Sequence, residues 1–130
     1  AVLPEPLADD LNTHNDAYPL ARPSEAAALA TLRHEPKIAA RMAELKSWTA
    51  ELAAEIRALG VRTYPTRTYF FLADFAPHDA SRLAAELRAR NILVKALNDP
   101  RLGQGFMRIT TALPQDNARF VENLRALLRG

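Results

Sequence analysis

The chain contains no cysteine, only four glycines and three lysines, and no long apolar run. The absence of cysteine excludes disulfides, thiolate metal sites and a cysteine nucleophile, and it fits a reducing compartment, so we expect a cytoplasmic location. The longest apolar stretches are too short to span a bilayer, and the first residues lack the basic segment that precedes the apolar region of a signal peptide. We therefore expect neither a membrane partner nor an export signal.

Charged residues are nearly balanced in number. Seventeen lysines and arginines stand against fifteen aspartates and glutamates, for a formal net charge of +2. The two signs are interleaved, as between Glu51 and Arg57, and form no cationic run. This balance argues against a nucleic-acid partner. A length of 130 residues favours one domain with a core of its own.

Side chains suited to metal binding or hydrolysis are scattered. Three histidines lie in separate segments, and none has a second histidine or an acid at metal-ligand spacing: His14, His34 and His78. The serines lie in predicted helices or at their starts, without the glycine-flanked turn of a hydrolase nucleophile: Ser24, Ser47 and Ser81. We therefore predict no metal site and no hydrolase chemistry.

The first part of the chain carries few structural signals. Acids and prolines occur there with little periodicity, so we interpret residues 1–16 as irregular, residues 1–22 as a connecting segment and residues 23–130 as one domain. Pro23-Ser24-Glu25 predicts a helix start with Ser24 as its cap.

Two later stretches have clear helical periodicity. Pro36 stands in the first turn of the longer one, which we expect to end at Gly60. Apolar residues recur along it at spacings of three, four and seven: Ile38, Met42, Leu45, Leu52, Ile56 and Leu59. Pro114 begins the last predicted helix, whose apolar face holds Phe120, Val121, Leu124, Leu127 and Leu128.

Strands and one shorter helix are predicted between these two helices. Val61–Tyr64 and Thr68–Phe75 are rich in β-branched and aromatic residues and can form a hairpin. Pro77 opens a helix that ends at Asn91, a residue type that tolerates the left-handed backbone, and Ile92–Ala96 is a short strand. With a further strand from residue 106, the order predicts an α+β fold. We expect a small, mainly antiparallel or mixed four-strand sheet with helices packed on one side.

Arg108 is the most informative residue of the chain. It stands in the apolar strand sequence Phe106–Thr111, where a period of two places it on the face opposite Met107 and Ile109. A guanidinium there needs an anion. The nearest acids in the sequence stand eight or nine positions away: Asp99 and Asp116. Arg108 therefore binds a carboxylate or phosphate of a substrate, or it lies on a solvated face or pairs with an acid remote in sequence.

The chain carries four segments in this order: Tyr18–Leu20 with Pro23-Ser24, Thr68–Phe75, Asn91–Lys95 and Met107–Thr110. This ordered set resembles the C-terminal part of the histidinol-phosphate aminotransferase family, whose members are fold-type I pyridoxal-phosphate enzymes. The resemblance implies that Arg108 binds the substrate carboxylate.

This sequence departs from the family at Asn91, where glycine is usual, and at two positions that bear on the site. Lys95, thirteen positions before Arg108, stands where the family usually has a second arginine. Lys95 is then either a second substrate-binding cation without the planar fork or an exposed residue at a strand end. Tyr69 stands where asparagine is common, and it either alters the pocket or fills the core.

The resemblance implies that the cofactor binds outside these four segments. A Schiff-base lysine needs a buried pocket that lowers its pKa. The chain has only three lysines, Lys37, Lys46 and Lys95, and the resemblance places the Schiff-base lysine upstream of all four segments. We therefore expect the chain to be the small domain of a longer aminotransferase and to be inactive alone. Its partner is then the large cofactor domain of the same chain, in a homodimer.

The implied substrates are an amino acid or amino-acid phosphate and a 2-oxo acid, with pyridoxal phosphate as the electron sink. Two alternatives remain. A related decarboxylase acting on an amino-acid phosphate would use the same small domain. A freestanding ligand-binding module could use Arg108 as its anchor, because a fold does not determine a function.

Overall fold

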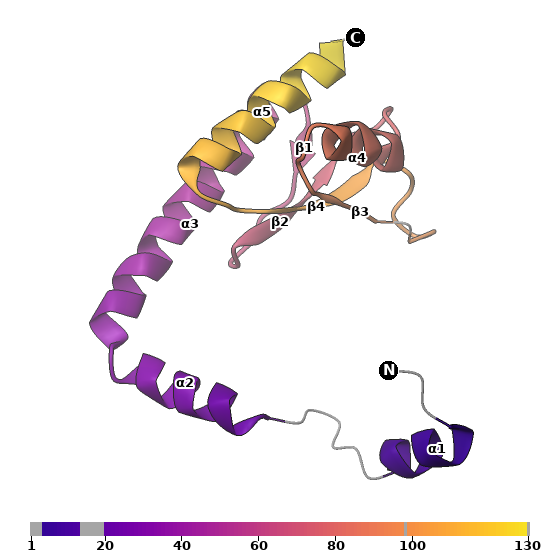
Figure 1. The fold of residues 1–130 in the computed structure, drawn as a ribbon. Coiled ribbons are helices and arrows are strands. Elements are labelled where there is room, and N and C mark those ends of the chain that lie inside the picture. Colours follow the sequence, from indigo (N-terminus) through magenta and orange to yellow (C-terminus); the bar gives the residue numbers. More distant parts are fainter. Residues whose placement is uncertain (1–3, 14–19, 98, 130) are drawn as a thin grey trace. The chain divides into compact units, whose positions relative to one another are not determined.

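A computed structural model describes residues 4–13, 20–97 and 99–129 (Figure 1). The contacts between residues divide the chain into two units, residues 1–39 and 40–130, and each unit is described by itself. The division falls inside one long helix. The boundary between the units therefore falls after residue 22, the predicted end of the connecting segment. The connecting segment stays a prediction.

The first unit contains two short helices, α1 (Glu5–Thr13) and α2 (Arg22–Leu32). The irregular structure predicted for residues 1–16 is wrong over α1, because Pro6 is tolerated in a first helical turn. The capping role predicted for Ser24 is also wrong. The cap of α2 is Ala21, and the backbone N–H of Ser24 lies inside the first turn and donates to the Ala21 carbonyl at 2.9 Å.

The long helix α3 (Glu35–Ala58) begins where Pro36 predicts and ends just before Gly60, whose φ of +85° suits glycine. Its buried residues lie only in the second half of the helix: Thr49, Leu52, Ala53 and Ile56. Met42, the second residue of the predicted apolar stripe, is 53% exposed. The apolar periodicity therefore predicts the helix correctly but overstates the length of its buried face.

The second unit is built on a four-strand sheet with strand order β1-β2-β4-β3, in which every neighbouring pair is antiparallel. Its strands are β1 (Arg62–Thr63), β2 (Phe70–Asp74), β3 (Lys95–Ala96) and β4 (Phe106–Thr110). The antiparallel sheet and the hairpin of β1 with β2 are confirmed. The two outer strands are shorter than predicted and pair over only two residues each.

Helix α4 (Ala80–Ala89) starts three residues after the predicted Pro77. The Asp79 side chain caps it, because a carboxylate oxygen accepts a hydrogen bond from the Arg82 N–H at 2.8 Å. The helix ends at Ala89, and Asn91 just beyond it adopts the left-handed region with φ of 59°, as the sequence predicts. The last helix, α5 (Pro114–Arg129), also starts at its predicted proline.

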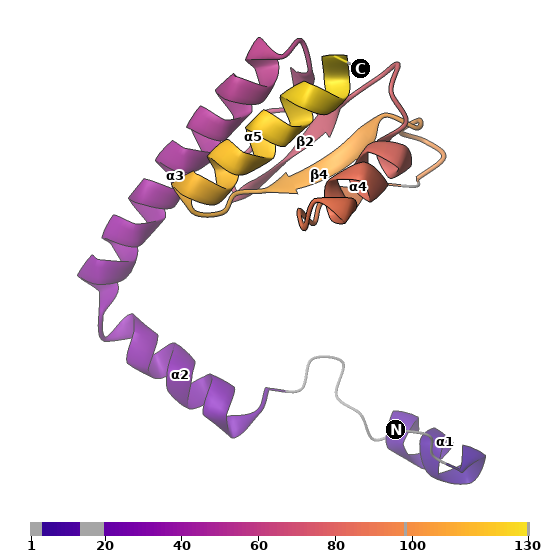
Figure 2. The same cartoon turned by 45° about the horizontal axis from the view of Figure 1, so that its top comes forward.

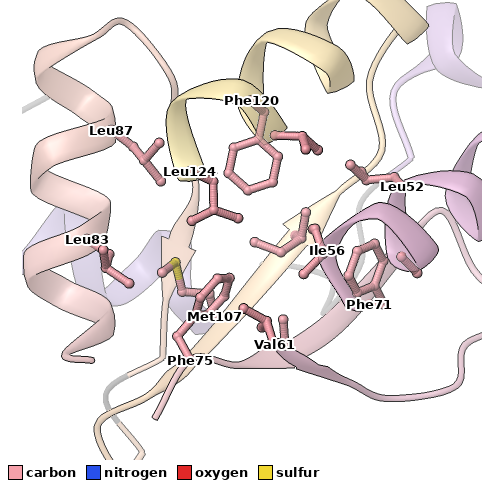
Figure 3. Close-up of a cluster of buried hydrophobic side chains, with 14 of the residues drawn as sticks. Leu52, Ile56, Val61, Phe71, Phe75, Leu83, Leu87, Met107, Phe120 and Leu124 are labelled. Atoms are coloured by element: carbon pink, nitrogen blue, oxygen red, sulfur yellow. The ribbon is translucent and has the colours of Figure 1, made fainter. Parts of the chain in front are cut away.

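The second half of α3 and the helices α4 and α5 pack on one face of the sheet, as expected (Figure 2). Figure 3 shows Leu52, Ile56, Leu83, Leu87 and Leu124 directed toward the side chains of the two central strands. The largest of the fully buried side chains come from every layer: Phe71, Phe75, Leu52, Ile56, Leu87, Met107, Ile109 and Leu124. This face is the hydrophobic core of the second unit.

Leu124→Ala should lower the free energy of unfolding by about 2–5 kcal/mol, because Leu124 is 0% exposed and the substitution leaves a cavity in the core. The measurement is urea unfolding of the 130-residue chain. Leu93→Ala, at a leucine that is 79% exposed, is the matched control and should change the free energy by less than about 0.5 kcal/mol. Similar losses in both variants would contradict the assignment of the core.

Candidate functional site

The face of the sheet that points away from these helices carries the predicted site. We call it the open face, and its central residues come from β2 and β4: Phe70, Leu72, Asp74, Phe106, Arg108 and Thr110. Met107 and Ile109 point into the core, so the predicted division of β4 into two faces is confirmed. Arg108 is exposed on the open face.

The structure brings the two predicted site residues together. In the antiparallel pairing of β3 with β4, Lys95 lies directly opposite Arg108. Residues opposite each other in such a pair share a face, with Cβ atoms roughly 5 Å apart. On the other side of β4, the partner of Arg108 is Leu72 of β2. Two cations from separate strands therefore stand side by side on the open face.

Neither cation is neutralised by the described part of the chain. The ion pairs found there join Arg41 to Glu44 and Arg101 to Asp99, and they involve neither Lys95 nor Arg108. Like charges that face each other across two strands repel. An anion bound between Lys95 and Arg108 would remove that repulsion.

Asp99, one of the acids nearest to Arg108 in sequence, is already engaged. Its two carboxylate oxygens accept hydrogen bonds from Nε and Nη2 of Arg101 at 2.9 and 2.6 Å. These bonds, with a further one from the Arg101 backbone N–H, lower the pKa of Asp99 below its usual value. Arg101 thus pairs with Asp99, the nearest carboxylate before Arg108 in the sequence.

Aromatic rings lie beside two arginines of the sheet. The guanidinium carbon of Arg108 lies 5.4 Å from the ring centre of Phe70, within cation–π range. Further along, the rings of Tyr64 and Phe106 lie 5.7 Å apart, and Arg62 lies 5.1 Å from the Tyr64 ring. Phe70 was not among the predicted site residues, although the alternation along β2 places it on the face opposite the buried Phe71.

Tyr69 does not fill the core. Its side chain is 53% exposed, and its ring meets the Phe70 ring edge-on at 5.6 Å. Its backbone carbonyl accepts a hydrogen bond from the Thr111 N–H at 2.8 Å, so this position also joins the end of β4 to the start of β2.

The described residues do not fit a bound pyridoxal phosphate. All three lysines are exposed, whereas a Schiff-base lysine needs a buried pocket. Over the same residues, no group of three or more histidines and acids could hold a metal ion, and no helix is long and apolar enough to cross a membrane. His14 lies outside the described residues.

A family model described as aminotransferase class I and II matches residues 1–124. Among curated proteins, a histidinol-phosphate aminotransferase of Acinetobacter baumannii (strain ATCC 17978) is 32% identical over 110 residues. The match covers 85% of this chain and 30% of that protein. The chain therefore spans less than a third of the length of this relative.

Solved structures share the fold. The histidinol-phosphate aminotransferase of Sinorhizobium meliloti, solved in complex with pyridoxal-5'-phosphate, has a TM-score of 0.75 at 19% identity, over 94% of this chain and 34% of that one. The L-threonine-O-3-phosphate decarboxylase of Porphyromonas gingivalis has a TM-score of 0.62 at 29% identity, over 67% of this chain and 28% of that one.

Lys95→Gln should raise the free energy of unfolding by about 0.2–1 kcal/mol at low ionic strength, because it removes a like charge opposite Arg108. The gain should disappear at about 0.5 M NaCl, where exposed charges are screened. Urea unfolding at both salt concentrations measures it. Arg88→Gln, the same charge change at an exposed position of α4, is the control and should show no such gain. A gain that salt leaves intact would show that Lys95 and Arg108 do not repel each other.

Proposed function

Because the chain belongs to the aminotransferase class I and II family, we propose that it is the C-terminal small domain of a longer aminotransferase and binds the anionic group of the substrate. The observation that carries this proposal is the pair of cations on the open face, Arg108 and Lys95, which lie opposite each other without a carboxylate partner among the described residues. The named relative supports histidinol-phosphate aminotransferase as the enzyme.

Arg108 is the residue that binds and orients the substrate. Its planar guanidinium can donate two parallel hydrogen bonds to a carboxylate or to two phosphate oxygens. The Phe70 ring beside it restricts the directions that the side chain can take. Lys95 adds positive potential at the same place but forms single, less directional hydrogen bonds. Pyridoxal phosphate, held by another part of the protein, supplies the electron sink for amino transfer.

The chemistry of the substrates fits one shared anion site. Amino transfer between histidinol phosphate and 2-oxoglutarate alternates a substrate that carries a phosphate with one that carries carboxylates. A guanidinium fork with a second cation beside it accepts both groups, because each presents two oxygens at similar spacing. Arg108 and Lys95 can therefore serve both halves of the reaction without moving from the sheet.

A decarboxylase of an amino-acid phosphate is the second candidate. The structural similarity to L-threonine-O-3-phosphate decarboxylase, at 29% identity, favours it specifically. The open face would bind the same kinds of anion in that enzyme. An assay of the assembled enzyme decides between the two activities, because only decarboxylation releases CO2. The freestanding module is the weakest candidate, since the family model matches nearly the whole chain.

Three further features of the whole protein belong to the same proposal. A large domain of the same chain would bind pyridoxal phosphate, two copies would form a homodimer, and the enzyme would work in the cytoplasm. The exposed positions of Lys37, Lys46 and Lys95 support a cofactor site outside this chain's described residues. The coding sequence upstream of Ala1 tests it directly, by the presence or absence of a lysine-bearing cofactor segment in frame.

Arg108→Ala in the assembled enzyme should weaken amino-acid binding on the order of ten- to several-hundredfold, because charged hydrogen bonds contribute roughly 1.5–3 kcal/mol each. Arg108→Lys should restore only part of this affinity, since it keeps the charge without the fork. The cofactor should bind as before. The measurement is a spectral titration of the holoenzyme with the amino acid.

The control for this experiment is a ligand rather than a variant. An amine analogue that lacks both the carboxylate and the phosphate should bind wild type and Arg108→Ala about equally. Equal losses for both ligands, or no loss for either, would show that Arg108 is a structural residue of β4 and that the site is wrongly assigned.

The 130-residue chain alone should give no Schiff-base absorbance with pyridoxal phosphate and no transamination, because each of its lysines is exposed and solvated. Borohydride reduction followed by peptide mapping checks this expectation. Weak labelling spread over Lys37, Lys46 and Lys95 is the background. Stoichiometric labelling of one lysine would contradict the proposal that the cofactor site lies elsewhere.

A further inference from the structure

A second set of cations lines a hollow beside the connection between β1 and β2. The hollow has a volume of about 440 Å³ and lies between the second half of α3 and the segment from Tyr64 to Thr68 that leads into β2. Lys46 and Arg57 line it from the helix, and Arg67 lines it from the segment. Neither Lys95 nor Arg108 is among its lining residues.

The charge of this hollow is of one sign. No aspartate or glutamate lines it, and none of the three cations forms an ion pair with the residues that the structure describes. Four positions before and after Lys46 the helix carries Met42 and Ala50, so the helix itself supplies no acid at those positions. Three cations around one concave surface favour an anion as its occupant.

Hydroxyl groups complete the lining. Thr66 and Thr68 belong to the segment side, and their side-chain oxygens lie 3.0 Å apart. The Thr68 N–H donates to Thr66 Oγ1 at 3.1 Å, and Thr68 Oγ1 lies 2.9 Å from the Phe70 carbonyl, so the segment has a defined local conformation. On the helix side, Arg57 Nη1 donates to Thr63 Oγ1 at 2.8 Å, which ties its guanidinium to the end of β1.

We propose that this hollow, lined by Lys46, Arg57 and Arg67, binds the phosphate group of a phosphorylated small molecule. The site is separate from the anion site on the open face and goes beyond the proposed function. Three cations match a phosphate dianion better than a single carboxylate, because phosphate carries up to two charges on three acceptor oxygens. The volume lies within the range of small-molecule sites, roughly 300–1,000 Å³, and leaves room for the organic part of a phosphomonoester.

The experiment is a titration of the 130-residue chain with glycerol 3-phosphate, followed by backbone amide NMR, with inorganic phosphate and glycerol as further ligands. We expect saturable shifts at residues 46–57 and 64–68 with glycerol 3-phosphate, weaker binding of inorganic phosphate and no effect of glycerol. The double variant K46A/R67A should bind at least about tenfold more weakly, because it removes two charged donors.

The matched control is R88A/R125A, which removes the same charge from exposed positions on α4 and α5 outside the hollow. It should keep its affinity within about twofold. R67Q, which preserves most of the side-chain length, gives a second measure if K46A/R67A loses its dispersed spectrum. Absence of saturable shifts, or equal losses in the two double variants, would overturn the proposal.

Arg108→Ala separates this site from the proposed function. Binding of glycerol 3-phosphate at the hollow should survive this substitution. Shifts that centre on β3 and β4 and disappear in Arg108→Ala would show that the phosphate binds the open face instead. Conversely, if Arg108→Ala does not weaken amino-acid binding in the assembled enzyme, the proposed function of Arg108 is wrong. Phosphate binding at the hollow is still expected in that case.

Discussion

The rest of the second unit depends on the register between β2 and β4. Leu72 pairs with Arg108 and Ala73 with Met107, so the inward side chains of both strands meet under α3 and α5 while Arg108 points away from them. A shift of one residue in either strand would turn its apolar side chains to the outside. The hydrophobic core therefore places the arginine: burying Met107 and Ile109 leaves Arg108 no other face.

The position of Lys95 follows from the same pair of strands and from the loop that joins β3 to β4. The Leu97 N–H donates to the Phe106 carbonyl, and the Phe75 N–H donates to the Gly105 carbonyl, so both ends of the loop are attached to the sheet. Gly105 is buried there, and a Cβ on it would lie 2.6 Å from the Ala76 backbone nitrogen. Close packing at this glycine supports the short strand that holds Lys95 opposite Arg108.

The sequence predicts best where the signal is local. The alternation from Phe106 to Thr110, the left-handed Asn91 and the proline at the start of α5 each depend on a few neighbouring residues, and each prediction is confirmed. The start of α4 was harder to predict, because the Asp79 side chain, beyond the proline, caps the helix. Contacts between strands could not be predicted from the sequence. The stacking of Phe70 on Arg108 and the facing of Lys95 and Arg108 exist only once the register is known.

The positions of the charged residues, rather than the net charge, determine which ligands this chain can bind. A formal charge of +2 describes a nearly neutral molecule, yet the fold gathers cations at two places where they form no ion pair with the described residues. Elsewhere it pairs them, as in Arg101 with Asp99. Cations on one surface that no carboxylate neutralises reduce stability, because they repel each other. A fold that balances its charges overall but concentrates cations on the open face and in the hollow at α3 therefore points to anions as the ligands of both surfaces.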